Sequence, residues 1–124
     1  MYTIFLIAGF GAFGCLSRYY LSARVYELLG RGFPYGTLAV NVVAAFIVGF
    51  IMEFSMESVL IPAALRAGLT IGFLGGLSTF STFSYETFRL LEEGEFLIAS
   101  ANVLASVAIC LFFVWLGIVT ARAL

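Results

Sequence analysis

The sequence predicts an all-α membrane protein with four transmembrane helices, the third of which is broken at mid-membrane. Composition is the first reason: the 124 residues are 63% hydrophobic and 10% charged, with a mean hydropathy of +1.13, and these values are typical of membrane proteins. Length is the second reason, because a spanning helix takes about 20 apolar residues and the chain therefore holds four spans with short connections. We expect a single domain over residues 1–124.

Charge and residue usage exclude several classes of function. The net charge of -1 and the scattered arginines give no basic patch, so we expect no nucleic-acid partner. Cys15 and Cys110 stand far apart, and the chain has no His and no Asp, so zinc and thiol-redox sites lack their ligands. No nucleophile is paired with a base. We therefore expect no catalytic residues and no enzyme activity.

The first span is expected over about 2–28. It begins without the charged segment or cleavage site of a signal peptide, so we expect it to be retained. Small residues recur at helical spacing on one face, a pattern typical of a packing seam between helices in lipid: Gly11, Gly14, Cys15 and Ser22. Arg18 lies on the same face, deep in the span. We expect it to play a structural role by bonding backbone carbonyls or a carboxylate.

The second span is expected over about 35–56 and contains a single amide side chain, Asn41. Two interpretations of this residue stay open. The first is a hydrogen bond between helices, worth of order 1 kcal/mol. The second is an NH₂ donor that faces a permeating anion.

The third span is expected over about 62–91 and changes character in its middle. The pair Gly75-Gly76 removes helix preference, Ser78 or Thr79 can cap a new helix, and the helical pattern returns at Phe80. This predicts two half-helices with a break near 75–78. Because such a break leaves backbone carbonyls and amides without helical partners, it favours an ion site.

Polar side chains crowd the second half-helix. Phe80 and Phe83 share one face, and an adjoining face carries hydroxyl groups and one carboxylate, among them Ser81, Thr82 and Glu86. A polar stripe of this length does not face lipid. Three states of Glu86 stay open: it is protonated, it is paired with Arg89, or it accepts hydrogen bonds from hydroxyl groups.

The fourth span is expected over about 96–120, where Asn102, Ser106 and Cys110 repeat every fourth residue and form a weakly polar line.

The arginines near the span ends bear on topology. Four spans put both termini on one side of the membrane. The arginines near the span ends divide almost evenly: Arg66 and Arg122 lie on the side of the termini, and Arg24, Arg31 and Arg89 lie on the other side. The positive-inside rule needs a marked imbalance to fix one orientation. We therefore expect insertion in both orientations and an antiparallel homodimer with its two-fold axis in the membrane plane.

In such a dimer the two helix breaks would meet near the midplane. Converging carbonyls of Gly75 and Ser78 suit a cation such as Na⁺. Beside them, the groups that suit a small anion are hydrogen-bond donors and the positive edges of aromatic rings: the Asn41 amide, the Ser81 and Thr82 hydroxyls, and Phe80 and Phe83. Without a full positive charge these groups bind weakly enough to release the ion, as conduction requires.

Three motifs resemble those of the Fluc family, the small CrcB-type fluoride channels, and the resemblance covers essentially the whole chain. They are Gly11-x-x-Gly14-x-x-x-Arg18-Tyr19, Gly36-Thr37-Leu38-x-Val40-Asn41, and the long, specific run GFLGGLSTFSTFSYE from Gly72 to Glu86. The resemblance implies an antiparallel, dual-topology homodimer with two fluoride pores and a central Na⁺, which is structural or regulatory. Some members place a tyrosine early in the fourth span, whereas this chain has no Tyr after Tyr85.

The same resemblance implies roles for individual residues. Phe80 and Phe83 would contact fluoride, Asn41 would line the pore, and the Gly75 and Ser78 carbonyls would hold Na⁺. The remaining pore residues would form a polar track: Ser81, Thr82, Glu86 and Ser106. The expected location is the cell inner membrane, as a multi-pass protein that lets cytoplasmic fluoride leave passively. Its expected partners are a second copy of itself and the lipid bilayer, with no obligatory partner of another kind.

Two other classes of function are weighed against a channel. Small proton-coupled multidrug transporters are also four-span antiparallel dimers, and Glu86 is the candidate for their intramembrane carboxylate. A hydroxyl-dense helix break has no role in that mechanism. A non-transporting membrane scaffold would explain the small-residue seams but not the break.

Overall fold

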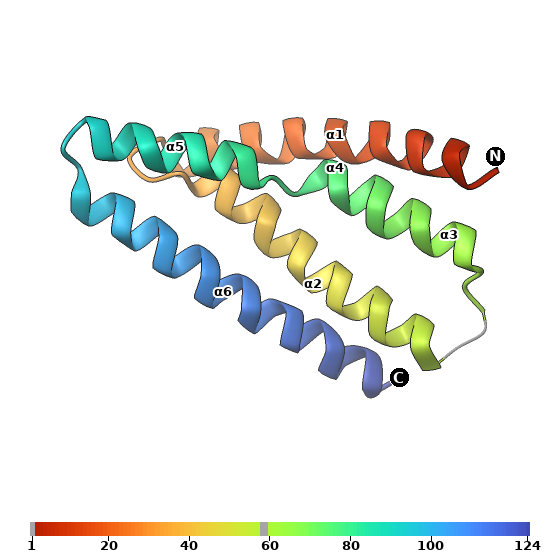
Figure 1. The fold of residues 1–124 in the computed structure, drawn as a ribbon. Helices are drawn as coiled ribbons and strands as arrows, with labels where there is room; N and C mark the ends of the chain where they lie inside the picture. Colours follow the sequence, from red (N-terminus) through yellow and green to blue (C-terminus); the bar gives the residue numbers. More distant parts are fainter. Residues whose placement is uncertain (1, 58–59) are drawn as a thin grey trace.

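The computed structural model describes residues 2–57 and 60–124 and is all-helical over them (Figure 1). Within these residues four helices are long and apolar enough to cross a membrane: Tyr2–Leu29, Tyr35–Met56, Ala63–Glu92 and Phe96–Arg122. The prediction of an all-α membrane protein with four candidate spans is thus confirmed.

Glycines end two of the helices where the chain reverses. Helix α1 covers Tyr2–Leu29, and Gly30 follows it with a φ of 84°, donating its N–H to the Tyr26 carbonyl at 2.8 Å. Only glycine adopts this left-handed conformation without strain. Gly94, with a φ of 77°, likewise separates α5, which covers Phe80–Glu92, from α6, which covers Phe96–Arg122.

Both chain termini lie at one end of the bundle, where α2 (Tyr35–Glu57) finishes and α3 (Ala63–Ala67) begins (Figure 1). The turns from α1 to α2 and from α5 to α6 lie at the other end. The order of the spans along the chain therefore gives an up-down-up-down arrangement.

The third span consists of four segments. After α3 comes a π-helix, η1, over Gly68–Leu74, then the short α4 over Gly75–Leu77, and finally α5 over Phe80–Glu92. Ser78 and Thr79 separate α4 from α5 in extended conformation. The predicted break is present, but it falls after the glycine pair, because Gly75 and Gly76 are themselves helical.

The glycines of the third span instead permit close packing against α1. A Cβ atom on Gly72 would lie 2.6 Å from the Ile7 carbonyl oxygen, and one on Gly76 would lie 2.7 Å from the Gly11 carbonyl oxygen. On the facing side, a Cβ atom on Gly14 would collide with the Phe73 carbonyl. The two backbones can therefore touch because each of these approaches has a glycine on at least one side.

The buried apolar core lies between α2 and the first half of the third span. Its buried members are Val40, Ala44, Leu74 and Leu77. Helix α6 packs along α2 on the side away from α1. This arrangement places the helix break beside α2 and packs α5 against α6.

Candidate functional site

The break is capped by Thr79. Its side-chain oxygen accepts a hydrogen bond from the Thr82 N–H at 3.1 Å, which is the standard way to satisfy a free amide in the first turn of a helix. Of the two capping residues that the sequence allowed, Thr79 therefore caps α5. The Ser78 hydroxyl donates to the Leu74 carbonyl at 2.8 Å instead.

Asn41 on α2 forms hydrogen bonds with the backbone at the break. Its Nδ2 donates to the Thr79 carbonyl at 3.2 Å, and its Oδ1 accepts from the Thr79 N–H at 2.8 Å. The interhelical hydrogen bond predicted for Asn41 is thus present. Because the NH₂ group has two hydrogens, one remains beyond this pair for another acceptor.

These two contacts free two backbone carbonyls. In a continuous α-helix the Thr79 N–H would bond the Gly75 carbonyl, and the Thr82 N–H would bond the Ser78 carbonyl. Both N–H groups are donated to side-chain oxygens instead. The Gly75 and Ser78 carbonyls thereby lose their helical donors.

Arg18 secures the first half of the broken span. Its Nε donates to the Gly76 carbonyl at 2.8 Å from α1. Of the two partners predicted for this arginine, a carbonyl or a carboxylate, the structure places a carbonyl there. A cation is favourable at this position because carbonyls at the end of a helix carry partial negative charge.

A groove of about 560 Å³ runs along the break, between α2, α5 and α6. It brings together six of the predicted site residues: Asn41, Gly75, Ser78, Phe80, Phe83 and Ser106. The Phe80 and Phe83 ring centroids lie 5.5 Å apart. Phe80 is 78% exposed in the single chain, so this part of the groove is open.

The other predicted residues lie outside this groove. Ser81 and Thr82 belong to the cap, since their hydroxyl oxygens lie 3.2 Å and 3.1 Å from the Thr79 hydroxyl oxygen. Glu86 lines a second pocket of about 250 Å³ nearer the α1–α2 turn. The predicted polar stripe is therefore divided between two cavities and a capping cluster.

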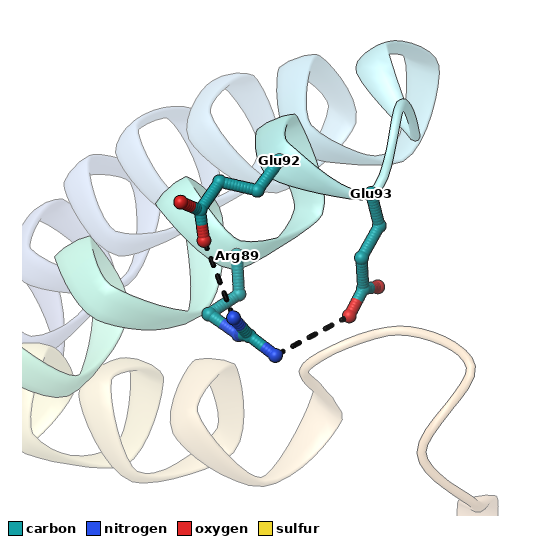
Figure 2. A network of polar contacts seen from close by, with 3 residues as sticks. All are labelled: Arg89, Glu92 and Glu93. Carbon is teal, nitrogen blue, oxygen red and sulfur yellow. Dashed lines mark hydrogen bonds and ion pairs between the residues drawn. The ribbon is translucent and has the colours of Figure 1, made fainter.

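Glu86 accepts two hydrogen bonds from hydroxyl groups. Thr37 Oγ1 donates to one carboxylate oxygen at 2.6 Å, and Tyr26 Oη donates to the other at 3.0 Å. Arg89 pairs with Glu92 at 3.3 Å and Glu93 at 4.0 Å (Figure 2). The hydroxyl contacts that the sequence left open for Glu86 are therefore present.

A buried chain of hydrogen bonds joins α5 to α6. Asn102 is only 1% exposed and donates to the Thr87 hydroxyl at 2.8 Å, while Ser106 donates to the Asn102 Oδ1 at 3.3 Å. Thr87 in turn donates to the Phe83 carbonyl at 2.7 Å. The polar line on the fourth span was visible in the sequence, but the role of Thr87 as its partner was not.

The roles of Tyr26 and Thr37 were also missed. Both are hydroxyl residues near the ends of spans, where such side chains are common, and no spacing rule links them to a carboxylate 60 and 49 positions away. The one signal in the sequence is the Glu86 carboxylate itself, because a carboxylate in an apolar span needs hydrogen-bond donors from neighbouring helices.

Fold and site together define an integral membrane protein of four spans in which a polar helix break opens into a groove, an arrangement found in transporters and channels. Comparison with known proteins gives the particular family. The family model described as CrcB-like protein, Camphor Resistance (CrcB), matches residues 5–118. The chain belongs to the CrcB family.

Several curated relatives match along the whole chain. A protein of Geotalea uraniireducens (strain Rf4) is 72% identical over all 124 residues of both chains, and one of Geobacter metallireducens (strain ATCC 53774 / DSM 7210 / GS-15) is 69% identical over the same length. One of Geotalea daltonii (strain DSM 22248 / JCM 15807 / FRC-32) is 67% identical over 122 residues, 98% of each chain. All three are named fluoride-specific ion channel FluC, which supports the expectation that this chain is not an enzyme.

Proposed function

We propose that this protein is a fluoride-selective ion channel through which cytoplasmic fluoride leaves the cell passively, lowering its toxicity. One observation carries the proposal: in a chain 72% identical to a fluoride-specific channel, Asn41, Phe80 and Phe83 line one groove beside a helix break. A negative cell interior favours anion exit by about 2.3 kcal/mol per 100 mV. We place the protein in the cell inner membrane.

The groove offers groups that suit a small anion. The positive edges of the Phe80 and Phe83 rings and the remaining N–H of Asn41 are neutral donors. The Ser106 hydroxyl lines the same groove and donates its proton to Asn102. The hydroxyls of Ser81 and Thr82 lie next to it around the cap. Neutral donors hold an anion loosely enough for it to move on to the next site.

The proposal includes an antiparallel, dual-topology homodimer with two pores. In a single chain the groove would expose polar backbone at the break to lipid, which is costly. A second copy across a two-fold axis in the membrane plane would cover it, and the nearly even distribution of arginines permits both orientations. The exposed Phe80 would then be covered at the interface.

The proposal also includes a sodium ion at the centre of the dimer. The Gly75 and Ser78 carbonyls, freed of their helical donors, would hold it as hard oxygen ligands. Among the described residues no cluster of His, Cys, Asp or Glu could hold a metal ion, so backbone oxygens are the fitting ligands. The ion would supply positive charge that holds the two breaks together.

Fluoride efflux from liposomes tests the proposal. Purified protein is reconstituted in fluoride-loaded vesicles and external fluoride is followed with an electrode, beside a Phe80→Ile, Phe83→Ile variant and chloride-loaded vesicles. We expect rapid fluoride release by the native chain, loss of it in the variant, and no chloride release. Folded protein that releases no fluoride would overturn the proposal.

A small proton-coupled multidrug transporter that uses Glu86 is the alternative. Such a transporter needs a carboxylate that is open to substrate and protons. The two hydroxyl donors on Glu86 weigh against it. Drug-driven proton uptake in the same vesicles, abolished by Glu86→Gln, would revive it.

A further inference from the structure

Helix α5 contacts its own chain through one face. Phe83 and Thr87 lie one turn apart on that face and are half-buried, whereas Tyr85 and Phe88 point outwards and are exposed. Of residues 80–92, all of which the structure describes, none is buried. Polar contacts with neighbouring helices therefore have a large share in fixing how α5 is rotated about its axis.

The Thr87 hydroxyl is bonded on two sides. It donates to the Phe83 carbonyl at 2.7 Å, and it accepts from Nδ2 of Asn102 on α6 at 2.8 Å. A threonine in a helix can bond the carbonyl four positions back, and its oxygen can then still accept a hydrogen bond. Here the neighbouring helix supplies that donor. The backbone of Phe83 is therefore linked to α6 through two consecutive hydrogen bonds.

Asn102 extends this link to the groove. Its side chain is almost completely buried, and its Oδ1 accepts from the Ser106 hydroxyl at 3.3 Å. Phe83 and Ser106 both line the groove, whereas Asn102 is not among the described residues that line it. One buried amide outside the lining thus joins a phenylalanine on α5 to a hydroxyl on α6.

From this arrangement we infer that Asn102 is a positioning residue that fixes the rotation of α5 through Thr87 and so holds the Phe83 ring in place at the anion path. The inference rests on the proposed function, in which Phe83 contacts fluoride. An aromatic ring attracts an anion at its positive edge and repels it at its negative face. A rotation of α5 would therefore weaken the attraction, and Asn102 sets the rate of permeation without touching the ion.

Single-channel recording in planar bilayers tests this inference, because each recorded current comes from a folded channel. Thr87→Val removes the hydroxyl and keeps the branched shape. We expect it to lower the fluoride current per channel about fivefold, the factor that corresponds to the net free energy of one hydrogen bond. Thr87→Ser keeps the hydroxyl and should carry the native current. If Thr87→Val gives fewer channels but the native current per channel, the role of Thr87 is merely structural and the inference is overturned.

Thr120→Val is the matched control. Thr120 on α6 also donates to the carbonyl four positions back, that of Leu116, at 2.8 Å, and it is not among the described residues that line the groove. This variant should keep the native current. An equal reduction by the two valine substitutions would show that the loss of any such hydroxyl lowers the current, and it would overturn the inference.

A double variant tests whether Asn102 acts through Thr87. In Asn102→Leu the Thr87 hydroxyl has already lost its donor from α6, so adding Thr87→Val should lower the current per channel no further. If Thr87→Val lowers the current by the same factor in the Asn102→Leu protein as in the native chain, the two residues act independently and the inference is overturned.

The native chain in the same bilayers separates this inference from the proposed function. A native chain that carries no fluoride current would contradict the proposed function, and the inference with it. A native fluoride current that Thr87→Val leaves unchanged would overturn the inference alone, because the channel would then work without the link from Asn102 to Phe83.

Discussion

The side-chain amide of Asn41 and the backbone of Thr79 form a closed pair of hydrogen bonds across 38 positions of sequence, at 2.8 Å and 3.2 Å. The bond to Asn41 Oδ1 satisfies the Thr79 N–H, which the helix break leaves without its helical acceptor in the membrane, where each unsatisfied group costs several kcal/mol. Asn41 is therefore part of the break itself.

Replacement of Asn41 should weaken the fold through this pair. Asn41→Leu removes both bonds at similar volume, and we expect a loss of about 2 kcal/mol in unfolding free energy. Asn41→Asp keeps the acceptor for the Thr79 N–H and loses the donor. Unfolding in detergent measures both variants. An Asn41→Leu protein as stable as the native chain would show that the pair does not support the break.

The N-cap of α5 gives a second prediction. Thr79→Ala removes the oxygen that accepts from the Thr82 N–H, and we expect a loss of about 1 kcal/mol. Thr79→Ser keeps that oxygen and should unfold within about 0.5 kcal/mol of the native protein. Equal destabilisation by the two substitutions would show that the methyl group, rather than the cap, matters at this position.

The adjacent glycines 75 and 76 should respond very differently to a methyl group. At Gly76 the new Cβ would lie 2.7 Å from the Gly11 carbonyl oxygen, whereas at Gly75 the nearest atom is the Thr70 carbonyl oxygen at 4.0 Å. We expect Gly76→Ala to cost about 1–3 kcal/mol by forcing α1 away, and Gly75→Ala to be tolerated. Thermal unfolding of the pair compares them, and similar midpoints would contradict the close approach of α4 to α1.

These glycines also mark where prediction from sequence stops. Apolar length and the hydroxyl-rich run were sufficient for four spans and a broken third one. Local preference assigned Gly75-Gly76 to the break, but helix packing keeps both residues helical, since the absence of a Cβ on Gly76 lets α1 approach. The contact is made by residues about 60 positions apart, and no local pattern encodes it.

The candidate site was likewise predictable from the sequence only in part. The presence of Asn41, Phe80 and Phe83 in one groove followed from the spacing around the break and from family resemblance. The donors to Glu86 could not be found, because Tyr26 and Thr37 belong to other helices whose relative rotation the sequence does not define. The structure adds these contacts.

Asn102 gives a fourth prediction, because it is almost completely buried and bonds two hydroxyl residues. Asn102→Leu would leave Thr87 without its donor and Ser106 without its acceptor. We expect a loss of about 1–3 kcal/mol in unfolding free energy. Val103→Ala, on the same helix but 39% exposed, is the control. A smaller effect from Asn102→Leu than from Val103→Ala would contradict the buried chain of bonds.

The freed carbonyls at the break give the last prediction, which rests on the proposed sodium site. If the Gly75 and Ser78 carbonyls hold Na⁺ between two chains, the ion binds the native dimer and not the unfolded protein, so it raises stability by mass action. The melting midpoint in detergent should rise with Na⁺ concentration, and N-methylglucamine at equal ionic strength should not replace it.

Asn41→Leu supplies the control for this sodium effect. Without the Asn41 side chain the Thr79 N–H regains the Gly75 carbonyl as an available acceptor, so the Na⁺-dependent rise should shrink while any general effect of salt remains. A midpoint that is the same in both salts would exclude a bound Na⁺ that stabilises the fold. A rise of equal size in the native and Asn41→Leu proteins would place the ion elsewhere than the break.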